Sequence, residues 1–365
     1  ILIIHLIIMT KSKLIFKGSS GCIFRPQIPC QKTKRKKKKS KNKVSKLMFD
    51  RGNHEYDFTK MIKKIKGHEK WTVLWEDMCK SSKYEELLKN TDIKKCIANN
   101  EDYSRITKDY QFLLYQGSYG GVTLDNYCTK NISKKILTNR KQFNQFFIKL
   151  FKLMKNVFYG LTQLYKHNIC HQDINIRNIL IKGNKSFIID YDISLKMKGI
   201  EKNKFLKKRM IEEMIGDRIY EAYPFEYYYY LLEDKKDILT EMDKINSYQN
   251  LIFYYELYEP IHKSIFNTDT DKLRSKLLED KLNGLDMDLD ELMRKLDTYS
   301  LATMILISVI DSAERLNIPL KNITPYFRSK ELKPYMDLIG DMIKFNYQDR
   351  ITPDEAYERY LNLIR

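Results

Sequence analysis

The sequence predicts an α+β protein in which a small, β-rich part is followed by a larger, helix-rich part. Between Lys13 and Ser118, short apolar runs alternate with Gly-rich and polar turns, which is the pattern of strands joined by tight turns. From Arg140 onwards, apolar residues recur at every third or fourth position, which is the spacing of an amphipathic helix. With 365 residues, 43% of them hydrophobic, the chain is long enough for two domains or one large two-lobed domain with a real core.

The first part is predicted to consist mainly of strands around one helix. A strand, a Gly/Ser turn and a second strand fill residues 13–25, and a third strand covers 43–49. Apolar residues at a helical spacing predict a helix over 54–65. Two further strands are expected at 71–78 and 111–115. This region closes near the Gly-rich sequence GSYGG, where the second part begins.

The second part is predicted to be mostly helical. One long amphipathic helix runs from Arg140 to about Leu164. Two short strands, 179–181 and 186–190, flank a Gly-Asn turn and form a hairpin. Later helices are expected at Asp297–Ile310 and Pro353–Leu363. No internal repeat is visible.

Much of the formal charge of +19 is concentrated in one tract. Nine Lys or Arg residues fall between Lys32 and Lys43, which leaves about +10 for the rest of the chain. Like charges at this density repel one another, so the tract is predicted to be a solvated loop. The alternatives are a nuclear localisation signal or a contact with a polyanion.

The first residues, ILIIHLII, are apolar but too few to span a bilayer, and no basic segment precedes them. We expect Met9 to be the natural start and residues 1–12 to form a non-native or disordered leader. No contact with a membrane is predicted.

The cysteine pattern predicts free thiols. The chain has six cysteines, and none of them forms a CxxC pair or a close, even spacing. Reduced thiols in a cytosolic-type compartment are therefore expected, and a zinc site is not.

The stretch HQDINIRNIL, residues 171–180, places Asp173, Arg177 and Asn178 within a few residues of a histidine. A predicted hairpin and the sequence FIIDYD, which contains Asp190, follow it. Phosphoryl transfer needs a carboxylate that orients a hydroxyl, and oxygen ligands that hold magnesium on the nucleotide phosphates. Asp173 can fill the first role, and Asn178 with Asp190 the second, because the hairpin would bring these two together. An Asx-capped loop would explain each residue singly but not their joint spacing.

This pattern, HxDxxxxN followed by a strand that ends in Asp, resembles the catalytic loop and metal motif of protein kinases. Five further matches extend the resemblance over nearly the whole chain, about Lys13 to Arg365. It implies a bilobal protein-kinase-like fold with an N-lobe at 13–118, including the basic insert 31–43. The C-lobe would cover 119–365, with an insert at about 227–296. The resemblance also implies ATP and Mg²⁺ bound between the lobes, and transfer of the γ-phosphoryl group to a protein Ser/Thr hydroxyl.

Two motifs of the first part extend the resemblance. KGSSGCI is similar to the glycine-rich loop, although Phe16 stands where the first glycine should be. KVSK is similar to the strand with the phosphate-binding lysine, which would be Lys46, with Lys43 as a rival. Glu55 is the expected ion-pair partner of that lysine, or else a solvated residue of the first helical turn. The implied nucleotide-binding residues are Gly18, Gly21, Ile23, Val44, Lys46 and Glu55.

Three motifs of the second part resemble structural features of the same family. YPFE is similar to the Pro-x-Glu that closes the activation segment, with Pro224 and Glu226. DTYSLA is similar to the helix whose aspartate, here Asp297, holds the backbone of the catalytic loop. DRITPDEAY is similar to the last family motif, in which Arg350 would pair with Glu226.

The chain departs from the family pattern at several positions of the site. Gln172 replaces an arginine that normally pairs with a phosphorylated activation loop, so control of that kind is not expected. Asn175 replaces the lysine of Ser/Thr kinases, and Arg177 is expected to supply the missing charge as a catalytic residue, unless it only pairs with an acidic surface residue. Asp192 replaces a glycine, so Asp190 and Asp192 are both candidate metal ligands, and Tyr191 in the Phe position favours Asp190.

Other features are most similar to the serine/threonine kinases of large nucleocytoplasmic DNA viruses. They are GCIFRPQIPC, the Gly120-Gly121 hinge, DYD and the long Tyr-rich insert. If the protein is viral, this likeness implies a location in the host cytoplasm or the virion. If it is not viral, a cytoplasmic or nuclear location is expected. The expected partner is a protein substrate, with a polyanion contact through Lys32–Lys43 as a further possibility, and no oligomeric state is predicted.

Two other functions remain open at this point. The departures at Phe16, Asn175 and Asp192 allow a pseudokinase, a binding scaffold without transfer. Small-molecule kinases of the aminoglycoside or choline type also show the HxDxxxxN pattern, but they lack the Pro-x-Glu, DTYSLA and DRITPDEA motifs. The joint presence of Lys46, Asp173, Asn178 and Asp190 favours an active protein kinase.

Overall fold

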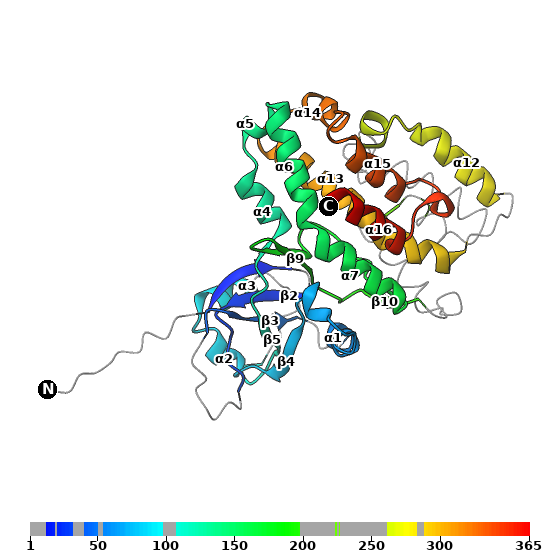
Figure 1. The fold of residues 1–365 in the computed structure, drawn as a ribbon. Helices are drawn as coiled ribbons and strands as arrows, with labels where there is room; N and C mark the ends of the chain where they lie inside the picture. The colour runs from blue at the N-terminus through cyan, green and yellow to red at the C-terminus, as the bar shows by residue number, and fades with distance from the viewer. Residues whose placement is uncertain are drawn as a thin grey trace. The chain divides into compact units, whose positions relative to one another are not determined.

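The computed structural model of the protein describes residues 12–18, 20–31, 40–49, 54–97, 107–197, 223–224, 226, 261–282 and 288–365. Three predictions fall largely outside these residues: the leader 1–12, the basic insert 31–43 and most of the insert at about 227–296. The course of the described chain is shown in Figure 1.

The chain divides into two compact units that are interleaved in sequence. The first unit is Ile1–Lys66 with Val73–Gly120, and the second is Gly67–Thr72 with Gly121–Arg365. We predicted a single boundary at 118/119, which assigns the segment 67–72 to the first unit, whereas the structure has it in the second unit. This segment belongs there because Trp71 is fully buried and Thr72 forms a β-bridge to Ile188.

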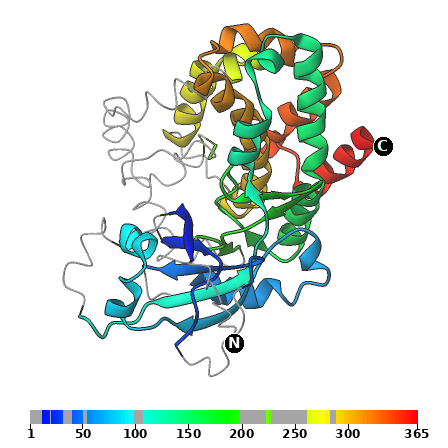
Figure 2. The same ribbon diagram turned by 90° about the vertical axis from the view of Figure 1, so that its left-hand side faces the viewer.

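The first unit is built on one antiparallel sheet with the strand order β1-β2-β3-β5-β4. Figure 2 shows β3 (blue) and β5 (cyan) side by side. The strands are β1 Lys13–Lys17, β2 Gly21–Arg25, β3 Lys43–Met48, β4 Trp75–Lys80 and β5 Leu113–Ser118. The helices are α1 His54–Ile62, α2 Tyr84–Leu87 and α3 Thr91–Ile97, of which only α1 was predicted.

The core of the first unit lies between the sheet and the two short helices. Cys22, Phe24 and Leu47 from the sheet pack with Ile93 and other residues of the α2–α3 region. At Gly21, a Cβ atom would lie 2.3 Å from the carbonyl oxygen of Leu47 in the neighbouring strand. Only glycine therefore lets β2 lie this close to β3 after the Gly/Ser turn.

The prediction of free thiols is wrong for four of the six cysteines. Cys22 of β2 is joined to Cys96 of α3, and Cys30 is joined to Cys79 of β4. The Cα atoms of the pairs are 6.3 and 5.8 Å apart, within the range that a disulfide spans. Sequence spacing could not reveal these pairs, because their members are 74 and 49 residues apart and meet only in the folded unit.

The remaining cysteines, Cys128 and Cys170, are free and buried. Burial raises the pKa of the Cys128 thiol to about 12, and it also raises the pKa of the fully buried Cys170 thiol. Because the thiolate is the reactive species, neither should react at neutral pH in the folded protein.

A thiol titration tests this arrangement. With a chromogenic disulfide reagent at pH 7, we expect no reactive thiol in the native protein and two per chain in denaturant without reductant. Six are expected after reduction in denaturant, which serves as the control for complete unfolding. Six thiols in denaturant without reductant would show that the disulfides are absent.

The second unit contains two small sheets and most of the helices. Its strands are β6 Val122–Thr123, β7 Ile169–Cys170, β8 Ile179–Lys182, β9 Lys185–Ile188 and β10 Leu195–Lys196, paired in the orders β6-β8-β9 and β10-β7. Its helices are α4 Leu124–Asn131, α5 Lys134–Leu137, α6 Arg140–Leu153, α7 Lys155–Lys166, α12 Thr270–Leu282, α13 Leu289–Arg315, α14 Leu320–Phe327, α15 Lys333–Met342 and α16 Pro353–Ile364. Single helical turns occur at His68–Lys70, Ile261–Ile265 and Tyr347–Asp349.

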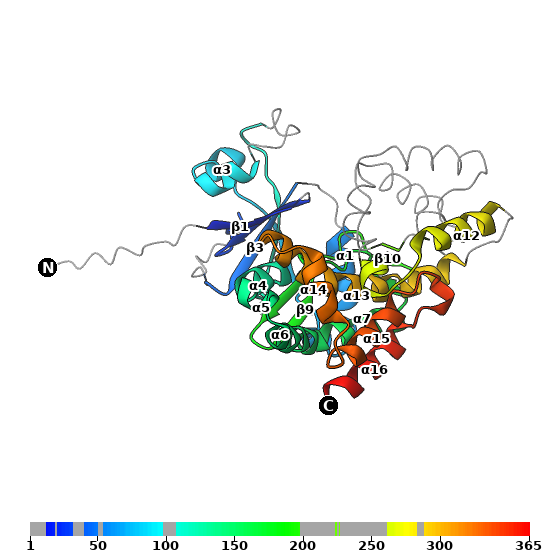
Figure 3. The same cartoon turned by 90° about the horizontal axis from the view of Figure 1, so that it is seen from above.

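Helix α13 is the central helix of the second unit. It contacts α4, α7, α14, α15 and α16, and Figure 3 shows it among these helices. Among the described residues it is the one helix long and apolar enough to cross a membrane, but 94% of its most apolar window is buried within the protein. Its apolar character is therefore that of a core helix.

The single long helix predicted from Arg140 is two helices, α6 and α7, with a break at Met154. Side-chain hydroxyls donate hydrogen bonds to the backbone carbonyl groups that directly precede this break. Tyr360 donates to the carbonyls of Phe151 and Lys152, at 3.1 and 2.9 Å, and Ser186 donates to that of Leu153 at 2.6 Å. These contacts come from distant parts of the chain, so the apolar periodicity alone could not reveal the break.

Candidate active site

The loop between β7 and β8 carries the predicted catalytic residues, and Asp297 of α13 holds its backbone. The carboxylate of Asp297 accepts hydrogen bonds from the N–H groups of His171, at 2.7 Å, and Gln172, at 3.0 Å. Burial raises the pKa of Asp297, and the two N–H donors oppose that shift. The predicted role of Asp297 in fixing this loop is confirmed.

His171 is fully buried and its two ring nitrogens have different partners. Nδ1 accepts a hydrogen bond from the N–H of Asp173 at 3.1 Å, and Nε2 donates to the carbonyl of Ile189 at 3.0 Å. Burial lowers the pKa of this imidazole, as expected for a neutral ring that donates through one nitrogen and accepts through the other. The ring thereby links the loop to the end of the β8–β9 hairpin.

The carboxylate of Asp173 lies between two asparagine side chains. Nδ2 of Asn178 donates to Oδ2 of Asp173 at 2.5 Å, and Nδ2 of Asn175 donates to Oδ1 at 2.7 Å. Each carboxylate oxygen therefore has an amide donor. This fixes the orientation of the side chain, and the lone pairs that remain can still accept a proton or a hydrogen bond.

Asn175 also shapes the loop itself, a role that we did not predict. Its Oδ1 accepts hydrogen bonds from the N–H groups of Arg177, at 2.8 Å, and Asn178, at 3.1 Å. This is an Asx-type cap, and an asparagine two residues before an N–H donor was the available sequence signal. A lysine at this position could not form the same cap, because its side chain has no acceptor.

Asn178 and Asp190 lie at the same end of the β8–β9 hairpin. The register pairs Ile179 with Ile188, and the N–H of Ile189 donates to the carbonyl of Asn178 at 3.0 Å. Asp190 has a φ of +66°, a left-handed backbone conformation that aspartate tolerates better than most residues. The side-chain nitrogen of Asn178 contacts Asp173, which leaves its amide oxygen as the atom that would face a cation.

These donors suit magnesium. Mg²⁺ takes oxygen ligands and is usually held by one or two carboxylates together with the phosphates of a substrate. Asn178 and Asp190 would hold it, and no cluster of three or more His, Cys, Asp or Glu side chains suited to a metal is found among the described residues.

Tyr191 anchors the segment that follows Asp190. It is buried, contacts the His171 ring edge-on at 4.8 Å, and its hydroxyl donates to Oγ1 of Thr72 at 2.9 Å. Thr72 in turn donates to the carbonyl of Ile188 at 2.7 Å. Asp192, the rival metal ligand, follows this anchored residue directly.

In the first unit, Lys46 and Glu55 form a buried ion pair with 2.8 Å between Nζ and Oε2. Their side chains are 5% and 2% exposed, so the interpretation of Glu55 as a solvated residue is wrong. Trp75 of β4 donates from its indole nitrogen to Oε1 of the same carboxylate at 2.5 Å, a contact that we did not predict. The rival Lys43 instead pairs with Glu76 at the surface.

The other predicted nucleotide-binding residues lie in the Gly-rich turn and on the strands next to it. The N–H of Gly18 donates to the carbonyl of Gly21 at 2.9 Å, which closes the turn between β1 and β2. Ile23 on β2 is paired with Lys46 on β3, two residues beyond Val44. These residues are thus adjacent in the sheet of the first unit.

Arg177 is exposed, and its guanidinium makes no ion pair with any described residue. The alternative in which Arg177 only pairs with an acidic surface residue therefore has no support within the described chain. Gln172 differs sharply: it is 2% exposed and has a left-handed φ of 65°. A buried neutral amide cannot replace the arginine that would attract a phosphate group.

The pairing of Arg350 with Glu226 is confirmed. Nη2 of Arg350 donates to Oε1 of Glu226, and the two side chains are almost fully buried. The guanidinium also donates to the carbonyl of Lys344 and lies over the ring of Tyr299, 4.6 Å from its centroid. Burial raises the pKa of Glu226, and the charge of Arg350 opposes that shift.

Comparison with known proteins agrees with this geometry. A family model described as fungal protein kinase matches residues 25–212, just over half of the chain. The chain belongs to the fungal protein kinase family. No curated protein matches it significantly.

The match covers most of the candidate site of this protein kinase family member. Lys46, Glu55, Asp173, Asn178 and Asp190 all lie within the matched residues. The glycine-rich turn precedes the match, and Glu226, Asp297 and Arg350 follow it, so their assignment rests on the sequence motifs and the contacts described above.

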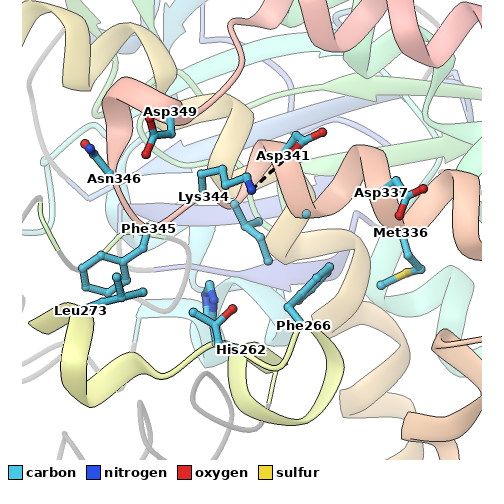
Figure 4. Close-up of a pocket in the computed structure, with 13 residues that line it drawn as sticks. His262, Phe266, Leu273, Met336, Asp337, Asp341, Lys344, Phe345, Asn346 and Asp349 are labelled. Atoms are coloured by element: carbon cyan, nitrogen blue, oxygen red, sulfur yellow. Dashed lines mark ion pairs between the residues drawn. The ribbon is translucent and has the colours of Figure 1, made fainter.

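A cavity of about 510 Å³ in the second unit of this kinase-family protein lies apart from these residues. Figure 4 shows it between His262, Phe266 and Leu273 on one side and α15 with the segment after it on the other. Asp341 on its wall is paired with Lys344 and Arg359, and Asp337 with Lys333. None of the predicted site residues lines it.

Proposed function

We propose that the protein is an active protein kinase that transfers the γ-phosphoryl group of ATP to a serine or threonine hydroxyl of a protein. The arrangement around Asp173 carries this proposal. Two amide donors orient its carboxylate, and the hairpin that follows carries Asn178 and Asp190 at its near end. A scaffold that only binds partners would not need this arrangement.

In the proposed mechanism, Asp173 orients the substrate hydroxyl and accepts its proton. Asn175 and Asn178 keep the carboxylate in place, and Asp297 holds the loop on α13. Lys46, oriented by Glu55, contacts the phosphates of the nucleotide, and Arg177 balances the charge on the transferred group. Magnesium, held by Asn178 and Asp190, would neutralise phosphate charge when it is bound.

The two other functions have less support. A pseudokinase would have no catalytic use for the buried Lys46–Glu55 pair, nor for the hydrogen bonds from two asparagines that orient Asp173. For a small-molecule kinase, the buried Glu226–Arg350 pair would be unexplained, since that group lacks both motifs.

Further proposals concern the origin and partners of the protein. A kinship with the kinases of large nucleocytoplasmic DNA viruses, with a place in the host cytoplasm or virion, rests on the sequence features alone. The alternative remains a cytoplasmic or nuclear protein. We also propose that the tract Lys32–Lys43 contacts polyanions, and no membrane contact is proposed.

The metal assignment is tested by ligand-induced stabilisation. ATP with Mg²⁺ should raise the melting temperature of the wild type more than ATP alone, and Asp190→Asn should lose this difference. A ligand at about 100 times its Kd stabilises a protein by roughly 2.7 kcal/mol, so the effect is measurable by thermal shift. Asp192→Asn is the matched control. If that variant loses the difference and Asp190→Asn keeps it, Asp192 is the ligand.

Substitutions in the loop separate the role of Arg177 from that of Asn175. Arg177→Ala should lower kcat about 10²- to 10³-fold, the range for loss of one transition-state donor, with little change in the Kd of ATP. Asn175→Ala should lower kcat less, about 10-fold. In this variant Asp173 loses one charge-assisted hydrogen bond but keeps the one from Asn178. Asn175→Asp keeps the acceptor of the cap but places a second carboxylate beside Asp173. The like charge should move the acid limb of the pH profile of kcat to higher pH. Small and equal effects of both alanine variants would contradict these roles.

A further inference from the structure

A second cavity, of about 680 Å³, lies in the second unit where the α6–α7 junction meets the turn of the β8–β9 hairpin. Its volume is in the range of small-molecule sites. We call it the lysine pocket, and its polar lining includes Lys149, Lys152, Lys155, Lys185, Asn156 and Asn184.

The walls of the lysine pocket are fixed by internal contacts. The buried hydroxyl of Ser186, next to Lys185, donates to the carbonyl of Leu153 and joins the hairpin to the end of α6. The break at Met154 ends α6 and starts α7, so Lys155 lies at the positive end of the α7 dipole. Gly183, with a φ of +62°, allows the tight turn that presents Asn184 and Lys185.

The charge of the lysine pocket is not balanced by neighbouring acids. No carboxylate lines it, and none of its four lysines has an ion-pair partner among the described residues. Two other exposed lysines of the same unit do have such partners, because Lys166 pairs with Asp354 and Lys333 with Asp337. Like charges on lysines that line one hollow repel one another, and an anion bound there would reduce that repulsion.

We propose that the lysine pocket binds a small, compact anion that carries two or more phosphate groups. A phosphate monoester carries a charge of about −1.5 to −2 at neutral pH, so two such groups balance four lysines. The amides of Asn156 and Asn184 can add hydrogen bonds to phosphate oxygens. Lysine binds phosphate as a point charge, whereas planar recognition of carboxylates is commonly the role of arginine, which is absent here.

A nucleic acid is a poorer match to the same lining. Single strands are bound along extended basic grooves with aromatic side chains that stack on the bases. No aromatic residue lines the lysine pocket, and its four lysines line a single hollow. The pocket also differs from the candidate active site, since it contacts the turn of the hairpin and Asn178 and Asp190 lie at the opposite end.

The proposal is tested with tripolyphosphate as the probe, by calorimetry on the full chain in EDTA and saturating adenosine. Lys149→Gln/Lys185→Gln should weaken binding roughly 10- to 30-fold, given the Coulomb energy of two close charges in water. Lys141→Gln/Lys321→Gln is the charge-matched control on the same unit and should stay within about twofold of the wild type, since long-range effects are screened by salt. Lys149→Arg/Lys185→Arg should retain most of the affinity.

A lysine-acetylation footprint gives an independent readout. Tripolyphosphate should protect Lys149, Lys152, Lys155 and Lys185 from acetylation, and leave Lys141 and Lys321 unprotected. Equal affinities of the pocket and control variants, or no binding to the wild type, would overturn the proposal. Binding of a doubly phosphorylated peptide without binding of tripolyphosphate would overturn the assignment to a small ligand.

Discussion

Asp173→Asn is expected to lower the rate of phosphoryl transfer by roughly 10²- to 10⁴-fold, the usual contribution of a general base. The variant keeps the size of the side chain but cannot accept the substrate proton. Its amide would also face the donor groups of Asn175 and Asn178, so one of the two hydrogen bonds to it becomes a contact between two donors.

The measurement is the initial rate with radiolabelled ATP, Mg²⁺ and a panel of generic protein substrates. The Kd of ATP should remain near that of the wild type, because Asp173 acts on the hydroxyl and not on the nucleotide. Asp337→Asn, the same change in an exposed pair with Lys333, is the control and should leave the rate unchanged. An unchanged rate in Asp173→Asn would rule out the base role and point to a contaminating activity.

Arg350→Met should destabilise the second unit by about 3–5 kcal/mol, the cost of breaking a buried ion pair from one side. Glu226, whose side chain is 1% exposed, would be left without its counter-charge. The carbonyl of Lys344 would also lose its donor. The free energy of unfolding in urea measures this effect.

Two comparisons make this result specific. Arg140→Met breaks an exposed pair with Glu331 and should cost at most about 1 kcal/mol. Glu226→Leu/Arg350→Met removes both charges and should recover much of the loss, since apolar replacement of a buried pair is often neutral or better. If the single and double variants lose the same free energy, the ion pair is not the source of the stability.

Local patterns were sufficient for the parts of the site that lie close together in sequence. The segment from His171 to Asp190 was predicted as a loop and a hairpin, and the structure has both, because the apolar alternation and the Gly-Asn turn determine the register. The resemblance to protein kinases, and not a local pattern, identified Glu55 as the partner of Lys46, and the structure has this pair.

Features that depend on tertiary contacts were missed. Apolar periodicity could not show that the hydroxyls of Tyr360 and Ser186 donate hydrogen bonds to backbone carbonyls at the α6–α7 break. The cysteine spacing led to a wrong prediction of free thiols, because the Cys22–Cys96 pair depends on the packing of α3 on the sheet and the Cys30–Cys79 pair on the place of β4 at the sheet edge. Asn175 was interpreted only as a missing lysine, although its acceptor atom organises the loop.

The short segment Gly67–Thr72 has a consequence for any attempt to divide the protein into fragments. A cut after Gly120 would separate this segment from the unit to which it belongs. The fragment 121–365 would lack Trp71, whose fully buried ring packs so closely against Gly160 of α7 that a Cβ there would lie 2.8 Å from it. It would also lack Thr72, the hydrogen-bond partner of both Tyr191 and Ile188. The two units are therefore separate as packed bodies but not as lengths of chain, and a helical unit produced alone would need this hexapeptide added back in trans or joined to its N-terminus.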